Sequence, residues 1–480
     1  MNKISDYRGR WEAVIGLEVH VQLRTRTKMF TPSEWCYGDS PNTQICPITL
    51  GYPGTLPTIN ISAVKKGILI GLSLNCDINN VTKFSRKHYF YPDLPKGYQI
   101  TQFDSPLCEN GYINLDSNKK IRITRAHLEE DAGKTIHTLE GNALIDYNRC
   151  GAPLLEIVSA PDMSGAEDAL EYLKSLKEII TSLKASDCDM EKGNLRVDLN
   201  ISVMPIGSKK LGTRREVKNV NSFRNIEKAI YYEFINQCQI IEDGGSIEQE
   251  TLLWDDKSGV TRSIRSKEDA HDYRYLPEPD LPPLEISDDL IKEIKEMIPE
   301  LPNQIRQTLR SQYLLNNDQT DFLISHRDLF DYYKIMCNND FTNSQKYFHW
   351  LTIDVIKYLK DSSTKIINFP IKPEELRRLV NLEIEKKINH SRAKKIYLEL
   401  LETGESLEKI ISGLPKGEYT LDEMAPYIES TLDKYKEEYT RLLDGETKLI
   451  NFFIGVIMKE SKGRYNPSSI TKYLKEKLNV

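Results

Sequence analysis

Strict alternation of apolar and polar residues marks two segments of the chain as strands with one buried face. These segments are Trp11–Leu23 and Leu195–Val203. The first places Glu18 and His20 two residues apart on its polar face, within reach of one ion, and the second places Asp198 on its polar face. A solvated strand face commonly shows the same pattern, so the three residues indicate a site only if other acid-bearing strands accompany them.

Two further acidic segments lie within Arg125–Asp162. In segment 121–131, alternation puts Ala126, Leu128 and Glu130 on one face and Arg125, His127 and Glu129 on the other. Only one of the two adjacent acids can therefore point into a site. Glu156 is the only charged residue of the apolar stretch Leu154–Val158. A carboxylate there must be paired, hydrogen-bonded, protonated or bound to metal, so a structural salt bridge and a cation site both remain open.

Helical periodicity replaces strand signals after the segment Pro299–Pro302. We therefore expect an α+β protein with a large antiparallel-sheet domain over residues 1–293. An all-helical domain should follow over 294–407, and a small helical tail domain over 408–480.

Composition restricts the class of protein further. The chain has 480 residues, a net charge of −6 and 28% charged residues, so no overall positive charge indicates binding to nucleic acid. The N-terminal segment lacks the apolar core of a signal peptide, and no apolar run reaches the roughly 18 residues of a membrane span. Eight irregularly spaced cysteines are typical of reduced thiols. We expect a protein without membrane contact in the cytoplasm, or in an organelle of similar redox state.

Three local features indicate binding. Segment Arg86–Gln102 contains Lys87, Tyr89 and Lys96, which either stack a base and hold a phosphate or form an aromatic corner of the core. Segment Lys459–Val480 carries six Lys or Arg against two Glu, and such a basic end can contact phosphate even on an acidic protein. The third is a proline-rich loop with two thiols, Cys36 and Cys46, and Thr49 three residues after the second. Two thiols do not complete a tetrahedral zinc site.

Known nucleotide and amidase motifs are absent from the sequence. No G-x-x-x-x-G-K-[ST] and no G-x-S-x-G occurs, and the only Gly-Gly-Ser, at 244–246, lacks the glycine and serine density of an amidase nucleophile loop. If the protein uses nucleotide or ammonia, it does so through an unfamiliar architecture or with a partner.

Several long strings resemble one family. They are VIGLEVHVQL, NTQICPITLGYPGTLP, KHYFYPDLPKGYQITQFD, ITRAHLEEDAGK, NRCGAPLLEIVSAPD, EKGNLRVDLNISV, EVKNVNSFRNIEKAI and DYRYLPEPDLPPL. In this order they closely resemble the B/E subunit family of the tRNA-dependent amidotransferases. The resemblance implies a cradle-like catalytic domain in which ATP phosphorylates the side-chain carboxylate of misacylated Glu-tRNA(Gln), Asp-tRNA(Asn) or both. Ammonia made from glutamine by a separate amidase then displaces the phosphate, in a heterotrimer in which the amidase is the A subunit and a small C subunit is the third member.

The resemblance also implies roles for individual residues. Glu18, His20, Glu130 and Glu156 match the positions at which the family holds Mg²⁺, although His is an unusual Mg²⁺ ligand and His20 then orients or ligates weakly. Glu130, Glu156 and Asp198 are the implied catalytic acids. Lys87, Tyr89 and Lys96 are assigned to ATP or the acceptor end. The basic residues of the tail, implied to contact tRNA, are Lys462, Arg464, Lys472 and Lys475.

The sequence departs from the family pattern at two positions, and two other functions compete with this interpretation. Thr49 stands where many relatives have a second Cys of a Cys-x-x-Cys, which puts a structural zinc in doubt, and Ala160 replaces a family Glu. The first rival is a non-catalytic tRNA-binding scaffold whose acids serve only as ion pairs. The second is a carboxylate-bound metal hydrolase that acts alone.

Overall fold

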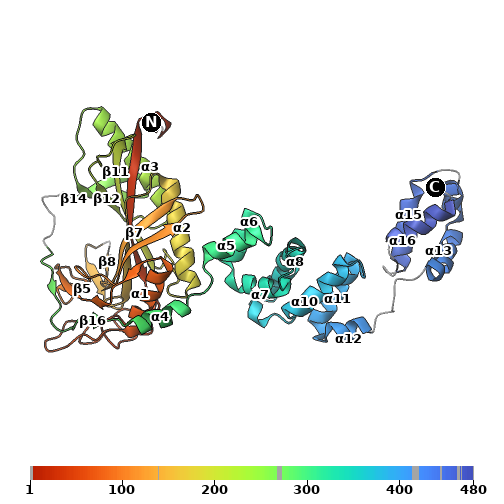
Figure 1. The fold of residues 1–480 in the computed structure, drawn as a ribbon, viewed down its shortest axis with the longest axis horizontal. Coiled ribbons are helices and arrows are strands. Elements are labelled where there is room, and N and C mark those ends of the chain that lie inside the picture. Colours follow the sequence, from red (N-terminus) through yellow and green to blue (C-terminus); the bar gives the residue numbers. More distant parts are fainter. Residues whose placement is uncertain are drawn as a thin grey trace. The chain divides into compact units, whose positions relative to one another are not determined.

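The computed structural model describes residues 4–138, 140–266, 273–412, 421–443, 446–461, 465 and 467–478. The chain divides into two compact units, Met1–Ile305 and Arg306–Val480 (Figure 1). The first unit contains the sheet and the second is helical, so the predicted α+β class is confirmed. Among the described residues, none of the helices combines the length and apolar character that crossing a bilayer requires.

A nine-stranded sheet forms the centre of the first unit, in the order β14-β13-β12-β11-β1-β10-β7-β6-β2. Its strands are β1 (Trp11–Gln22), β2 (Asp77–Ile78), β6 (Cys108–Asn114), β7 (Lys120–Glu130), β10 (Pro153–Ser159), β11 (Leu195–Pro205), β12 (Arg215–Lys218), β13 (Glu250–Asp255) and β14 (Val260–Ser266). Neighbouring strands run antiparallel except β12 and β13, which are parallel. The strands β1 and β11, predicted from alternation, pair with each other along almost their whole length.

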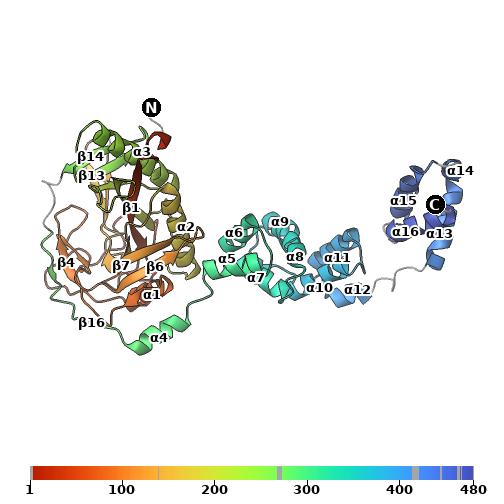
Figure 2. The ribbon, with the colours of Figure 1, turned by 45° about the horizontal axis from the view of Figure 1, so that its top comes forward.

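Helices cover one face of this sheet. They are α1 (Ile61–Ser73), α2 (Ala166–Ser182) and α3 (Phe223–Glu242) (Figures 1 and 2). Leu173, Leu176 and Ile180 recur at helical spacing on α2 and are buried in the same core as Leu17 of β1 and Leu155 of β10. Because side chains alternate along a strand, the residues between these apolar positions point to the other face of the sheet.

Several smaller elements complete the first unit. The three-stranded sheet β15 (Leu276–Pro277), β4 (Ser85–His88) and β5 (Tyr98–Thr101) contacts the end of β7, where the amide of Gln99 donates to the Glu130 carbonyl at 2.7 Å. The remaining short elements are the 3₁₀ turn Ile4–Asp6, the pair β16 (Leu284–Glu285) and β3 (Val81–Thr82), and the hairpin β8 (Lys134–His137) and β9 (Ala143–Asp146).

The second unit consists of helices, beginning within α5 (Pro302–Ser311). Its other helices are α6 (Asn317–Ser325), α7 (Arg327–Cys337), α8 (Ser344–Trp350), a π-helical turn Leu351–Val355, α9 (Ile356–Asp361), a 3₁₀ turn Ile366–Asn368, α10 (Pro373–Ile384), α11 (His390–Thr403), α12 (Leu407–Ser412), α13 (Leu421–Lys434), α14 (Lys436–Leu443), α15 (Leu449–Glu460) and α16 (Pro467–Leu478). A hydrophobic core shared by α13 to α16 contains Met424, Ile428, Phe453, Ile457 and Leu474.

Both predicted domain limits fall on helices. The limit at 293 lies inside α4 (Asp288–Glu296), which packs against α1 through contacts such as Lys65 Nζ to Glu293 Oε1 at 3.3 Å. The limit at 407 lies on the first residue of α12. The division between the two compact units lies later, at Ile305 and Arg306 within α5.

Candidate active site

The pairing of four central strands places acids and imidazoles side by side. Glu18 of β1 lies directly opposite Asp198 of β11, and His20 of β1 lies opposite Glu156 of β10. Glu156 in turn lies opposite His127 of β7. All five side chains lie on the face of the sheet that α1, α2 and α3 leave uncovered, because the core residues alternate with them. The strand register therefore assembles a polar cluster from segments far apart in the sequence.

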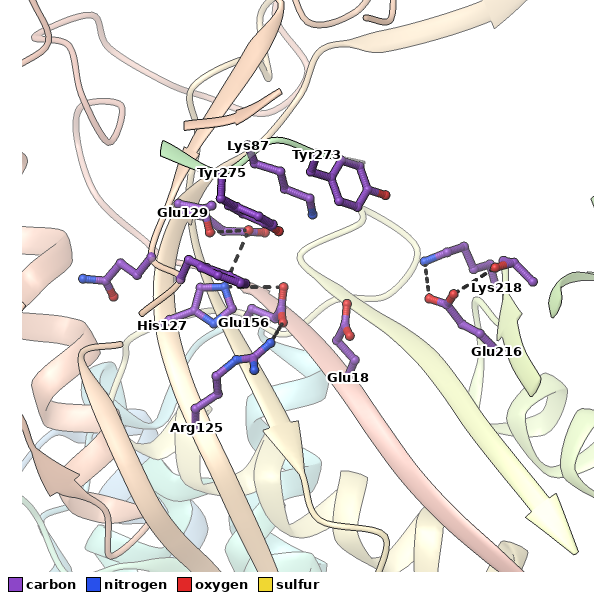
Figure 3. Close-up of a pocket in the computed structure, with 14 residues that line it drawn as sticks. Glu18, Lys87, Arg125, His127, Glu129, Glu156, Glu216, Lys218, Tyr273 and Tyr275 are labelled. Atoms are coloured by element: carbon purple, nitrogen blue, oxygen red, sulfur yellow. Dashed lines mark hydrogen bonds and ion pairs between the residues drawn. The ribbon is translucent and has the colours of Figure 1, made fainter. Parts of the chain in front are cut away.

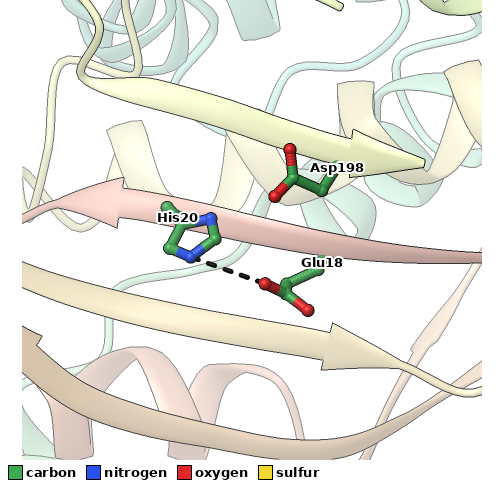
Figure 4. A group of neighbouring side chains, drawn as sticks. All are labelled: Glu18, His20 and Asp198. Carbon is green, nitrogen blue, oxygen red and sulfur yellow. Dashed lines mark ion pairs between the residues drawn. The ribbon is translucent and has the colours of Figure 1, made fainter. Parts of the chain in front are cut away.

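His20 lies at the centre of this cluster. Its Nε2 atom is 3.3 Å from Glu156 Oε2, 3.7 Å from Glu129 Oε1 and 3.7 Å from Glu18 Oε1. Two groups of potential ligand atoms, each within 4.8 Å, share this histidine. One consists of Glu18, His20 and Asp198 (Figure 4), and the other of His20, Glu129 and Glu156.

The structure places Glu130 apart from the other residues matched to the family's Mg²⁺ positions. Its carboxylate pairs with Lys96 and accepts the N–H of Ile100 at 3.0 Å, and it does not join Glu18, His20 and Glu156. The adjacent acid Glu129 takes the place in the cluster. The cause is alternation: Glu130 continues the face of β7 that carries the core residues Ala126 and Leu128, whereas Glu129 continues the polar face. The hydroxyl of Thr101 fixes Glu129 Oε2 at 3.2 Å.

Four residues of the cluster, Glu18, His127, Glu129 and Glu156, line a pocket of about 310 Å³ (Figure 3). Its walls are formed by Glu18, Lys87, Thr101, Gln102, Phe103, Arg125, His127, Glu129, Glu156, Glu216, Lys218, Thr251, Tyr273 and Tyr275. Three cations accompany the acids. Arg125 Nη2 lies 3.7 Å from Glu156 Oε1, Lys218 Nζ lies 2.8 Å from Glu216 Oε1, and Lys87 reaches into the pocket from β4. The pocket thus offers oxygen ligands for a cation and positive groups for an anion.

Comparison with known proteins identifies the family. The model of the GatB/GatE catalytic domain matches residues 13–292, and that of the GatB domain matches residues 331–478. Proteins named as the B subunit of aspartyl/glutamyl-tRNA(Asn/Gln) amidotransferase align over nearly the whole chain. The one from Thermoanaerobacter pseudethanolicus is 42% identical and covers 98% of this chain and 100% of its own length. Those from Thermodesulfovibrio yellowstonii and Trichlorobacter lovleyi are 43% and 44% identical, covering 97% and 98% of this chain and 98% and 99% of their own lengths. The chain belongs to the GatB/GatE family.

The family resemblance read from the sequence strings is therefore confirmed. In this member of the GatB/GatE family, burial and the charge of Glu156 raise the pKa of Glu18 to about 7. Burial alone would lower the pKa of His20, but the hydrogen bond with Glu156 and the charges of the neighbouring acids raise it to about 9. Burial opposes ionisation of Glu156, yet the imidazoles of His127 and His20 hold the pKa of this carboxyl well below its usual range.

These pKa shifts show which charges surround the acids of the cluster at neutral pH. At neutral pH an imidazolium at His20 is the cation nearest to them, and Glu18 remains only partly ionised. A metal ion needs deprotonated ligands, so protons compete with it for the same atoms. A carboxylate that is buried and still short of positive charge is the form of ligand that a divalent cation stabilises.

The other predicted binding residues of this family member lie in different places. Lys87 lines the pocket, with Nζ 4.9 Å from the centre of the Tyr273 ring. Tyr89 packs edge-on against Tyr91 and Tyr273 and does not line the described pocket. Lys96 is bound to Glu130.

The tail and the thiol loop lie away from these residues in the sequence. Lys472 and Lys475 are exposed on α16, whereas Lys462 and Arg464 lie outside the described residues. Cys46 Sγ lies 3.4 Å from Thr49 Oγ1, and Cys36 is exposed. Neither thiol belongs to the metal-capable groups found in the described part of the chain.

Sequence reasoning missed several pocket residues. Arg125, His127 and Glu129 alternate along β7 and therefore lie on one face of the strand. The apolar residues between them already marked the other face as the core face, so the sequence pattern indicated that these three side chains point to the polar side. Glu216 and Lys218 belong to the string EVKNVNSFRNIEKAI, to which the sequence alone assigned no site residue. Their position in the pocket wall depends on the pairing of β12 with β11, which no local pattern indicates.

Proposed function

We propose that this chain is the subunit of a tRNA-dependent amidotransferase that activates and amidates misacylated tRNA. ATP phosphorylates the side-chain carboxylate of Glu-tRNA(Gln), Asp-tRNA(Asn) or both, and ammonia displaces the phosphate to give the amide. This is the chemistry of an ATP-dependent carbon–nitrogen ligase. The observation that carries the proposal is the pocket on the open face of the sheet, in which buried acids and three cations converge.

The donor set fits a divalent cation such as Mg²⁺. Glu18, Glu129 and Glu156 supply oxygen atoms, which Mg²⁺ prefers, and His20 lies between them. The side chains of Glu129 and Glu156 are only 4% and 7% exposed, so their charges need compensation. When bound, the ion supplies charge neutralisation for phosphoryl oxygens and aligns the reacting groups.

The residues of the chain position the remaining partners. Lys87 and Arg125 place positive charge on the wall that carries Glu129 and Glu156, where phosphate or a substrate carboxylate can be held. Lys218 Nζ lies 2.5 Å from Asp198 Oδ2 and 2.8 Å from Glu216 Oε1, and its charge reduces the repulsion between these acids and an anionic substrate. The hydrogen bond from Thr101 holds Glu129 in the orientation that faces the cluster.

Ammonia has to come from another protein. The chain lacks the amidase motifs, and its relatives are named as B subunits, which marks them as parts of a complex. We infer a heterotrimer in which an amidase, the A subunit, hydrolyses glutamine and a small C subunit completes the assembly. The basic tail, with Lys462, Arg464, Lys472 and Lys475, is inferred to bind a part of the tRNA other than the acceptor end.

The test uses the chain purified with co-expressed partners. Glu18→Gln, Glu129→Gln and Glu156→Gln should each reduce ATP-dependent phosphorylation of the substrate carboxylate by about 100-fold or more, because each removes a carboxylate that would hold the cation. Glutamine hydrolysis by the partner should persist. Assays with misacylated tRNA of each kind determine which amino acid is accepted.

Glu12→Gln is the matched control. Glu12 lies on the same face of β1 as Glu18 because side chains alternate along a strand, but it does not line the pocket. It should leave phosphorylation unchanged. Full phosphorylation by all three pocket variants would show that the chain is a tRNA-binding scaffold, and amidation or hydrolysis by the isolated chain with glutamine would show that no amidase partner is needed.

A further inference from the structure

Two aromatic rings at the pocket wall stack on each other. The centres of the Phe103 and Tyr275 rings are 4.1 Å apart and their planes differ by 9°. Phe103 follows β5 and Tyr275 precedes β15, and the small sheet β15-β4-β5 brings the two segments together. Both residues line the pocket, and Tyr275 lies beside Lys87 there (Figure 3).

Core packing does not account for this pair. Neither ring belongs to the hydrophobic core cluster formed by the described residues of the first unit. Phe103 is 52% exposed, although a buried position would stabilise the fold by removing its apolar surface from water. Aromatic rings that remain accessible beside a polar pocket are typical of surfaces that bind a flat ligand.

The surroundings hold the pair in a fixed position. Gln102, next to Phe103, is buried, donates to Thr82 Oγ1 at 2.6 Å, and accepts the N–H groups of Leu107 and Leu128 at 3.1 and 2.9 Å. On the other segment, Tyr273 packs edge-on against Tyr275 at 6.1 Å. A surface that is rigid before binding loses little conformational entropy when a ligand stacks on it.

The cations beside the rings match the rest of a nucleotide. Lys87 Nζ lies 4.9 Å from the centre of the Tyr273 ring, and Arg125 lines the same pocket. A flat apolar surface next to positive groups is complementary to a nucleobase joined to phosphate. We propose that Phe103 and Tyr275 form a stacking platform for a nucleobase whose phosphate lies beside Lys87. This inference rests on the proposed function, which supplies two sources of the base, ATP and the 3′ end of the tRNA.

The experiment compares probes with and without the base on the full-length chain with its partners. Equilibrium dissociation constants are measured for ATP and inorganic tripolyphosphate, and for tRNA with and without its 3′-terminal nucleoside. Phe103→Leu and Tyr275→Leu keep apolar volume but remove the flat face. Each affinity ratio divides the affinity of the probe with the base by that of the probe without it. In the two Leu variants one of these ratios should fall by about tenfold, equal to about 1.4 kcal/mol, because base stacking on an aromatic ring contributes on this order.

Controls separate stacking from folding and from the proposed function. Tyr275→Phe keeps the ring and should keep the wild-type ratio, and so should Phe90→Leu, which changes a ring that is 87% exposed and does not line the pocket. A fall in the ATP ratio assigns the platform to ATP, and a fall in the tRNA ratio assigns it to the tRNA end. Unchanged ratios in both Leu variants would overturn the proposal. If the wild-type complex does not amidate misacylated tRNA, the proposed function is wrong, whereas the affinity ratios can still be measured.

Discussion

Glu129 and Glu130 are adjacent acids, and the structure predicts that their removal has opposite effects. Glu130→Gln should destabilise the first unit but leave the acids of the polar cluster in place. Glu129→Gln should weaken binding of Mg²⁺ while the fold remains stable. The reason is that Glu130 neutralises the buried Lys96, whereas Glu129 lies beside His20 in the cluster.

The magnitudes follow from burial. The side chains of Lys96 and Glu130 are 7% and 3% exposed. Removing one partner of a buried ion pair costs about 3–5 kcal/mol, because the other charge is left uncompensated. At roughly 2 °C per kcal/mol for a unit of this size, the unfolding temperature should fall by about 6–10 °C. Glu129→Gln removes repulsion from Glu156 as well as attraction to His20, so its change should be about 1 kcal/mol or less.

Calorimetry measures both effects. Scanning calorimetry gives the unfolding temperatures, and isothermal titration with Mg²⁺ gives the affinities. The double variant Lys96→Met/Glu130→Gln replaces both charges and should recover most of the stability lost by Glu130→Gln alone. If Glu130→Gln unfolds at the wild-type temperature but no longer binds Mg²⁺, while Glu129→Gln still binds it, the assignment of these acids to opposite sides of β7 is wrong.

Three further predictions concern protons and the tail. The pKa of Glu18 is raised from 4.5 to about 7, so between these pH values the folded metal-free chain holds a proton that the unfolded chain has released. The stability of the fold should therefore decrease as the pH rises from 4.5 to about 7. Calorimetry of Glu18→Gln should show a smaller decrease. Mg²⁺ affinity should increase from pH 6 to pH 9 with release of protons, since Glu18 and His20 must lose them, and titration in buffers of different ionisation enthalpy would reveal a constant, proton-independent affinity if this is incorrect. Replacing the exposed Lys472 and Lys475 with Gln should weaken tRNA binding and reduce the slope of log affinity against log salt by about 1–2; identical slopes across a salt series would show that neither lysine contacts phosphate.

Much of the fold was predictable because single elements carry their own pattern. Alternation over Trp11–Leu23 and Leu195–Val203 corresponds to β1 and β11, and the change to helical periodicity after Pro302 corresponds to the helical unit. The order of strands was not predictable in this way. It depends on which apolar faces meet α1, α2 and α3, and the parallel pairing of β12 with β13 has no local signal.

The candidate site shows the same division. The sequence indicated Glu18, His20 and Glu156, and alternation showed that only one of the acids at 129 and 130 could accompany them. The family resemblance favoured Glu130, but the core positions of Ala126 and Leu128 place Glu129 in the cluster. Contacts between distant segments, such as the stacking of Phe103 on Tyr275, arise only from the assembled sheet.

The register of the central strands has a consequence for how this protein can evolve. The cluster is built from side chains on β11, β1, β10 and β7, and the register of each pair fixes its neighbours. A shift of one residue in any pair would turn a cluster residue toward the helices and a core residue toward solvent. Insertions are therefore tolerable in the connections between these strands but not within them. New substrate preferences in such a protein should arise from changes around the rim of the pocket, while the strands themselves stay constant in length.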